Sequence, residues 1–169
     1  MIRSQHAAWQ AIQSAKVVFF SEIIYTSNYI FYFCAINTSE MILNRLSILN
    51  YKNILQAEVA FSPKMNCFFG NNGMGKTNLL DAIYYLSFAK SHIHTLDSQI
   101  IHNEQDMCVL QGYYDYEGRA EEIFCAIRRK QRKQFKRNKK EYDKLSEHIG
   151  LLPLVMVSPA DADLIRGGS

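Results

Sequence analysis

A glycine-rich stretch, GNNGMGKT at residues 70–77, limits what this chain can fold into more than any other part of its sequence. It matches the spacing G-x-x-x-x-G-K-[ST], in which inward-turned backbone amides and the amino terminus of a following helix bind phosphate groups. Glycine is required where the backbone must turn without the clash of a Cβ atom. The motif therefore predicts a nucleotide-phosphate site in which Lys76 reaches the outer phosphates and Thr77 is a ligand of Mg²⁺.

The motif is informative only between a strand and a helix, and both flanks fit that requirement. Residues 65–69 form a short apolar run that is typical of a buried strand. From Asn78 onward, Leu79, Ile83 and Leu86 recur at three- and four-residue steps, which predicts a helix buried over most of its surface. We therefore favour the phosphate loop over the alternative of an ordinary glycine-rich turn.

Positive charge is concentrated in one segment. Residues 128–140, RRKQRKQFKRNKK, hold nine of the 19 Lys and Arg residues and no acid, so the remaining ten bases face 16 acids and the rest of the chain has a net charge of −6. Such a cluster attracts nucleic acid, although a solvated charged hairpin is an equally good interpretation of charge alone. The predicted DNA-binding residues are Arg128, Arg129, Lys130, Arg132, Lys133, Lys136, Arg137, Lys139 and Lys140.

The lone aromatic residue of that run, Phe135, has two possible roles. It could stack on a base, or it could fill the apolar face of a sheet. We expect the second role, because the alternation in QFKRN is typical of a strand that turns near Asn138.

The rest of the chain predicts an α/β domain with an antiparallel β-meander. With 169 residues and 48% hydrophobic content, one domain is expected. The predicted elements are two strands within 42–61, paired strands at 107–116 and 121–129 with a turn at 117–118, a helical turn at 145–149, a strand at 152–157 and a helix at 160–165.

Residues 1–40 differ in character from residues 41–169. Residues 17–36 are long enough to span a bilayer but are interrupted by Glu22, Asn28 and several hydroxyl groups, so a membrane anchor is the less favoured alternative. We interpret Met41 as the natural start and residues 1–40 as a poorly ordered upstream extension. The ATPase part is then 41–169.

Cysteine and histidine do not suggest a metal or redox site. Cys34, Cys67, Cys108 and Cys125 are far apart and lie in apolar surroundings, so we expect reduced, buried thiols in a cytoplasmic protein. A metal shared by His92 and His94 is a weaker alternative to two solvated side chains.

From Met41 to Ser169 the chain resembles the amino-terminal part of the RecF family, bacterial DNA replication and repair proteins related to the Rad50 and SMC class of ATP-binding-cassette ATPases. Three stretches carry the resemblance, namely MILNRLSILNYKNI, GNNGMGKTNLLDAIYYLS and GLLPLVMVSPADADLIRGGS. It implies lobe I of an ATP-binding-cassette P-loop NTPase whose carboxy-terminal half is missing. The ATP-binding residues that it implies are Gly70, Asn71, Asn72, Gly73, Met74, Gly75, Lys76, Thr77, Asn78 and Lys52.

The chain also departs from the family pattern. Lys52 stands where the family has an arginine, and the segment KSHIHTLDSQII lacks the family's arginine. No apolar run ending in Asp-Glu and no Ser-Gly-Gly signature occurs, so the carboxylates that hydrolysis needs are absent. Catalytic residues are therefore not predicted, and the chain is expected to bind nucleotide with little turnover.

For the full-length protein the resemblance implies a weak ATPase that forms an ATP-dependent homodimer. It also implies binding to single-stranded DNA and to junctions, partnership with RecR, and loading of RecA in recombinational repair and the SOS response. Three alternatives remain open: a nucleic-acid-binding module without catalysis, an inactive fragment, and a small-molecule P-loop kinase, for which no lid arginine is apparent.

Overall fold

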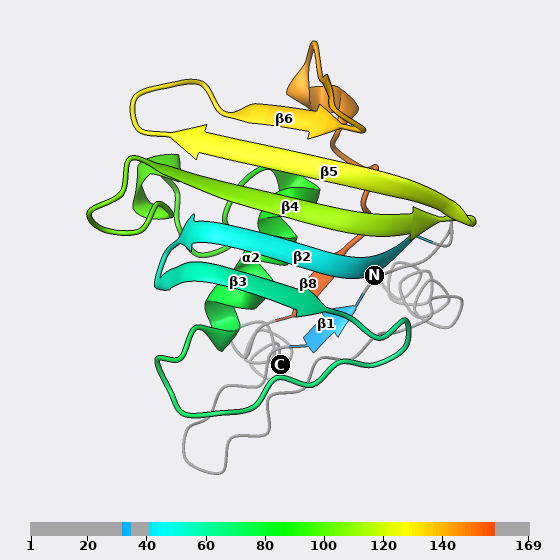
Figure 1. Cartoon of the computed structure of the whole chain (residues 1–169), viewed down its shortest axis with the longest axis horizontal. Helices are drawn as coiled ribbons and strands as arrows, with labels where there is room; N and C mark the ends of the chain where they lie inside the picture. Colours follow the sequence, from blue (N-terminus) through cyan, green and yellow to red (C-terminus); the bar gives the residue numbers. More distant parts are fainter. Residues whose placement is uncertain (1–31, 35–40, 158–169) are drawn as a thin grey trace, which may run out of the picture. The chain divides into compact units, whose positions relative to one another are not determined.

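The computed structural model describes residues 32–34 and 41–157 (Figure 1). These residues fall into two compact units, one with residues 41–63 and 70–152 and the other with residues 32–34, 64–69 and 153–157. The expected helix at 160–165 lies outside the described residues, as do most of the proposed extension and most of the possible anchor at 17–36. Among the described residues, no helix is both long and apolar enough to cross a membrane.

The larger unit is built on one antiparallel sheet of six strands in the order β3-β2-β4-β5-β6-β7. The predicted meander is confirmed, including the turn at 117–118 between β4 and β5. The strands are β2 (Met41–Tyr51), β3 (Ile54–Ala60), β4 (Met107–Tyr116), β5 (Arg119–Arg128), β6 (Gln134–Arg137) and β7 (Lys140–Glu141). Two 3₁₀ turns, η1 (Asp97–Gln99) and η2 (Leu145–Glu147), lie in the connections, and η2 confirms the predicted helical turn.

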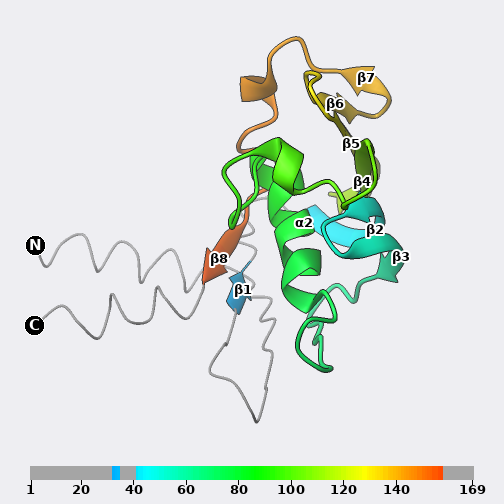
Figure 2. The ribbon, with the colours of Figure 1, turned by 90° about the vertical axis from the view of Figure 1, so that its left-hand side faces the viewer.

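Alternation along the strands places the core on one face of the sheet. In β4, for example, every second residue from Cys108 to Tyr114 is buried. Helix α2 (Lys76–Phe88) lies along this face, as Figure 2 shows. The side chains of Leu46, Ile48, Leu110 and Ile123 are at most 1% exposed beneath it, so burial of the shared apolar face stabilises both layers.

The carboxyl end of α2 is completed by two basic side chains from distant parts of the chain. Lys133 Nζ donates to the Ala89 carbonyl at 2.6 Å, and His148 Nε2 donates to the Leu86 carbonyl at 2.5 Å. Helix carbonyls at this end have no partner within the helix, and the positive charge of Lys133 is favourable there. Phe135 is 3% exposed and packs between Tyr85 and His148, which confirms that it fills the apolar face of the sheet.

Two predictions around residues 65–69 are wrong. These residues form no strand, and Cys67 is exposed, whereas Cys108 and Cys125 are buried free thiols as expected. An apolar run becomes a strand only when neighbouring strands bind its backbone. In the smaller unit the strand predicted at 152–157 is the shorter β8 (Val155–Val157), which pairs antiparallel with β1 (Tyr32–Cys34).

Protonation of buried His148 is expected to weaken the fold. Burial lowers its pKa, and its ring is neutral, with Nε2–H on Leu86 O and Nδ1 accepting from the Tyr142 hydroxyl at 3.2 Å. Because the unfolded chain binds the proton more readily, this contribution is complete above the unfolded pKa near 6.5 and is lost as the pH falls. We expect the free energy of unfolding to decrease below pH 6.5 by up to about 1.4 kcal/mol per pH unit.

Urea unfolding between pH 7.5 and pH 5 measures this dependence. A His148→Gln variant should be less stable at pH 7.5 and should lose the slope between pH 6.5 and pH 5. An equal slope in the two proteins would show that another group titrates.

Candidate functional site

The predicted phosphate loop has the backbone of an anion-binding loop. Gly70, Gly73 and Gly75 have φ angles of 147°, 82° and 95°, which are positive values that other residues adopt at a cost. Lys76 Nζ folds back over the loop and donates to the carbonyls of Gly70 at 2.9 Å and Asn71 at 2.8 Å. The ammonium thus lies at the mouth of the loop, where the motif requires it.

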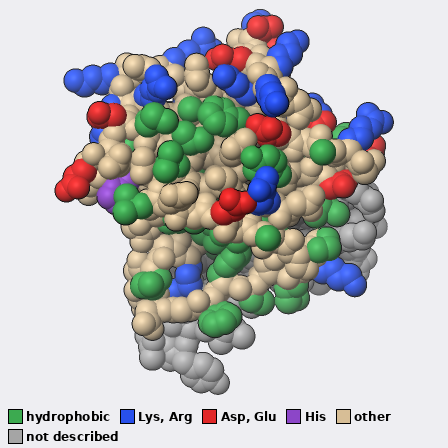
Figure 3. All heavy atoms as spheres, in the orientation of Figure 1, with side chains coloured by type: hydrophobic (Ala, Val, Ile, Leu, Met, Phe, Trp, Pro, Cys, Tyr) green, Lys and Arg blue, Asp and Glu red, His purple; other side chains and the backbone are tan. Residues whose placement is uncertain are grey.

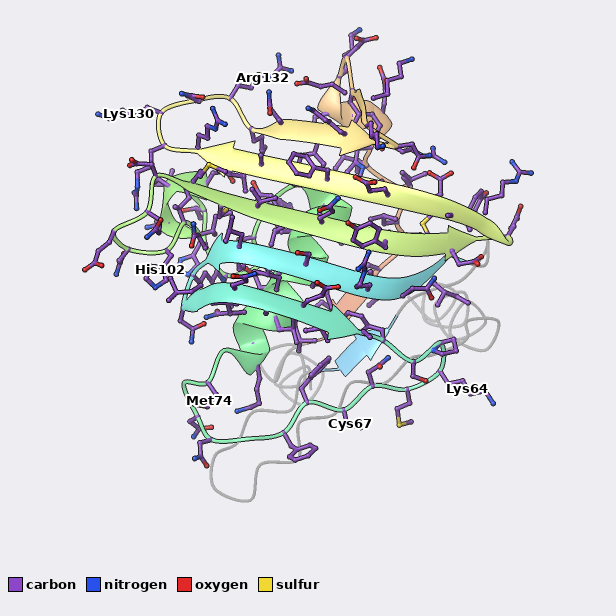
Figure 4. All side chains as sticks on the ribbon, in the orientation of Figure 1. Lys64, Cys67, Met74, His102, Lys130 and Arg132 are labelled. Carbon is purple, nitrogen blue, oxygen red and sulfur yellow. The ribbon has the colours of Figure 1, made fainter. Side chains whose placement is uncertain are left out.

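Helix α2 starts at the residue that the motif specifies. Its N-cap is Gly75 in the left-handed conformation, and the Leu79 amide donates to the Gly75 carbonyl at 2.8 Å as the first bond of the helix. The first turn contains no acidic residue, so its positive end is not offset by a carboxylate. The hydroxyl of Thr77 lies in this turn, and Met74 is 72% exposed at the tip of the loop (Figure 4).

The turn between β2 and β3 is bonded directly to this loop. Asn53 Nδ2 donates to the Gly73 carbonyl at 2.8 Å, and Asn78 Nδ2 donates to Asn53 Oδ1 at 2.7 Å. Sequence reasoning predicted Asn78 but missed Asn53, which lies 20 residues before Gly73. The only indication of this role in the sequence was that Asn53 is an uncharged polar residue in a tight turn next to Lys52.

Lys52 is more buried than its predicted contact with a nucleotide suggests. Its side chain is 6% exposed, and Nζ forms an ion pair with Asp81 Oδ2 at 2.5 Å. Burial lowers the pKa of Lys52, while the Asp81 carboxylate acts in the opposite direction. A contact between Lys52 and ATP stays a prediction.

Asp81 links four parts of the larger unit, although sequence reasoning did not single it out. Its carboxylate accepts from Tyr51 Oη at 2.6 Å, from Ser91 Oγ at 2.7 Å and from the His92 amide at 2.7 Å, in addition to the ion pair with Lys52. Burial acts to raise the pKa of Asp81, but these donors and the charge of Lys52 outweigh it and hold the pKa below its usual value. The indication in the sequence was the single acidic residue of the helix, which has apolar residues on both sides.

A polar hollow of about 340 Å³ lies beside the start of α2. Lys52 and Asn53 line it on one side, Asn78 on another, and His94, Gln99 and His102 come from the segment between α2 and β4. Its volume is within the range of small-molecule sites. His94 therefore faces the hollow, whereas His92 packs edge-on against Tyr84, and the described residues contain no group of three His, Cys, Asp or Glu side chains able to hold a metal.

The predicted basic segment divides into anchored and exposed side chains. Lys133 forms an ion pair with Asp97 at 3.0 Å, Arg137 binds Glu121 through two hydrogen bonds, and Arg129 donates to backbone carbonyls. Figure 3 shows several Lys and Arg side chains, with some acidic ones among them, over the part of the molecule that holds β5 and β6, where Figure 4 labels Lys130 and Arg132. The exposed members are Arg128, Arg129, Lys130, Arg132, Lys139 and Lys140, and Lys136 is half-buried.

Comparison with known proteins agrees with this architecture. A solved structure of the recombination mediator protein RecF with ATP superposes with a TM-score of 0.62 at 23% identity, covering 66% of this chain and 31% of that one. The SMC head domain from Thermotoga maritima superposes with a TM-score of 0.54 at 17% identity, covering 63% and 40%. The chain therefore has part of the P-loop fold of the ATP-binding-cassette type.

The RecF/RecN/SMC N-terminal domain model matches residues 42–160, and the chain belongs to this family. The DNA replication and repair protein RecF of Parabacteroides distasonis is 85% identical over 129 residues, and that of Phocaeicola vulgatus is 66% identical over 130 residues. Each alignment covers 76% of this chain, and the chain spans only 35% of the length of these curated relatives.

Proposed function

We propose that residues 70–78 bind ATP as part of a RecF-type DNA replication and repair protein. The observation that carries this proposal is the geometry of the loop, in which three glycines at positive φ lead into a helix whose first residue, Lys76, folds back over the loop. The loop amides and the ammonium would bind the phosphates, and the polar hollow beside Asn53 and Asn78 would receive the nucleoside.

The residues present also suit a magnesium ion delivered with ATP. Thr77 offers a hydroxyl in the first turn of α2, and no carboxylate lies in that turn to compete with the phosphates. When bound, Mg²⁺ would neutralise phosphate charge. This chain's own residues would position the triphosphate, and hydrolysis would need carboxylates that residues 70–78 do not supply.

For the whole protein we propose ATP-dependent binding to single-stranded DNA and to junctions, with the exposed side chains of residues 128–140 contacting phosphates. The same proposal includes dimerisation of the protein when it binds ATP and partnership with RecR. It also includes loading of RecA in recombinational repair and the SOS response, in the cytoplasm. Support comes from family membership and from the curated RecF relatives. The second candidate is a nucleic-acid module that works without ATP, and the gathered basic side chains favour it.

One titration series separates the two candidates. DNA affinity of the full chain is measured by fluorescence anisotropy against salt, with and without ATP and Mg²⁺. We expect the affinity for DNA to fall as salt is added and to rise with ATP. Replacing Arg128, Lys130 and Arg132 by Gln should make the slope of log affinity against log salt concentration shallower, by about 0.7 for each lost contact to a single strand.

The matched control replaces Lys90, Arg119 and Lys144, three exposed bases outside the segment, by Gln. It changes the net charge equally and should leave the slope nearly unchanged. Affinity that depends on salt but ignores ATP would favour the module, and an equal loss in both triple variants would rule out the basic segment as a defined interface.

A further inference from the structure

The turn between β2 and β3 holds the phosphate loop through a single side chain. Asn53 uses both ends of its amide, because Nδ2 donates to the Gly73 carbonyl and Oδ1 accepts from Asn78 Nδ2. One partner lies in the loop and the other in the first turn of α2. The amide therefore fixes the middle of the loop relative to the helix that comes after it.

Packing around Asn53 leaves this arrangement little freedom. A Cβ atom added to Gly75 would lie 2.9 Å from Asn53 Oδ1 and 3.4 Å from Asn53 Nδ2, so the side chain fills the space beside the N-cap. The neighbouring residue Lys52 ties the same turn to Asp81, one helical turn further along α2. The turn is thus held to α2 at two points.

From this geometry we infer that Asn53 is a positioning residue for phosphate binding, and this inference rests on the function proposed above. Gly73 has a φ of 82°, and the peptide groups on either side of it determine which way the loop amides face. By holding the Gly73 carbonyl toward the sheet, Asn53 turns that oxygen away from the phosphates. A carbonyl oxygen that rotated freely could face the phosphates and repel them.

The test compares ATP with tripolyphosphate, each with Mg²⁺, by isothermal titration calorimetry on the full chain. Asn53→Ala removes the hydrogen bonds to Gly73 and to Asn78, and it should weaken both ligands by the same factor, about 3- to 10-fold. Asn53→Asp fills the same space and can accept from Asn78, but it cannot donate to Gly73 and brings a negative charge near the phosphates. It should weaken both ligands more than Asn53→Ala does, by more than about 10-fold.

Tripolyphosphate distinguishes this role from a role in the polar hollow, which Asn53 also lines. A loss seen with ATP alone would place Asn53 on the nucleoside and overturn the inference, as would unchanged affinity for both ligands in the two variants. Asn44→Ala, at an exposed position of β2, is the matched control and should bind like the wild type. If Asn53→Ala does not fold, Asn53→Asp provides the comparison.

Different results would refute the proposed function and the inference about Asn53. A folded wild-type chain that binds neither ligand would refute nucleotide binding itself. A wild-type chain that binds both ligands, with variants that bind equally well, would refute only the role of Asn53.

Discussion

Replacing Lys76 by alanine is expected to abolish detectable ATP binding by this chain. The ammonium that folds over the loop, 2.9 Å from Gly70 O and 2.8 Å from Asn71 O, is the only positive side chain within residues 70–78. Its bonds to phosphate would be charge-assisted, so its loss should weaken binding at least about 100-fold, or ~2.7 kcal/mol. Calorimetry with ATP and Mg²⁺ measures the loss.

The control for Lys76→Ala is Lys90→Ala, which removes an exposed lysine just beyond α2 and should bind ATP like the wild type. Thermal unfolding of both variants checks that the fold is kept. Since Lys76 also bonds to the loop carbonyls, a Lys76→Arg variant tests whether charge alone suffices, and we expect it to bind weakly because a guanidinium is a planar fork instead of a compact ammonium. Unchanged affinity in Lys76→Ala would refute the assignment of the loop.

The largest loss of stability is expected from Asp81→Ala. This change leaves the ammonium of Lys52 buried without its partner and removes the acceptor of Tyr51, Ser91 and the His92 amide. Breaking a buried ion pair by removing one partner typically costs about 3–5 kcal/mol, a large part of the total stability of a domain. Urea unfolding at pH 7.5 measures the difference.

Two further variants separate the buried charge from a general effect of losing an acid. Glu58→Ala removes a carboxylate that is 60% exposed and pairs with Arg45, and it should cost at most about 1 kcal/mol. Adding Lys52→Met to Asp81→Ala should recover part of the stability, because no unpaired charge then remains in the interior. A cost below about 1 kcal/mol for Asp81→Ala would show that Lys52 finds water or another acceptor.

Short sequence patterns correctly predicted the strands, turns and helix that depend on residues close together in the sequence. The alternation in residues 107–116 and 121–129, the turn at 117–118 and the glycine spacing before Lys76 each depend on neighbours in sequence, and the structure has the strands, the turn and the helix that they predict. The strand predicted at 65–69 depends on distant partners for its backbone, which an apolar run does not reveal. The prediction that Cys67 is buried failed for the same reason, because it assumed this strand.

In the candidate site, too, features that depend on nearby residues could be predicted and features that depend on distant residues could not. The residues of the loop could be identified from spacing, whereas Asn53 and Asp81 act through side chains that only the fold brings next to their partners. The basic segment is an intermediate case. Its charge is visible in the sequence, but the anchoring of Lys133 on Asp97 and Ala89 depends on the packing of α2 against β6.

The way in which α2 ends has a consequence for how the domain folds during synthesis. The groups that complete its last turn are 44 and 62 residues away in sequence, so closing these contacts costs the chain entropy that local bonds do not. While a ribosome is making the chain, the helix can start at Lys76 as soon as it emerges, but its far end must wait until residue 148 has left the exit tunnel. We expect the nascent helix to fray from that end until then.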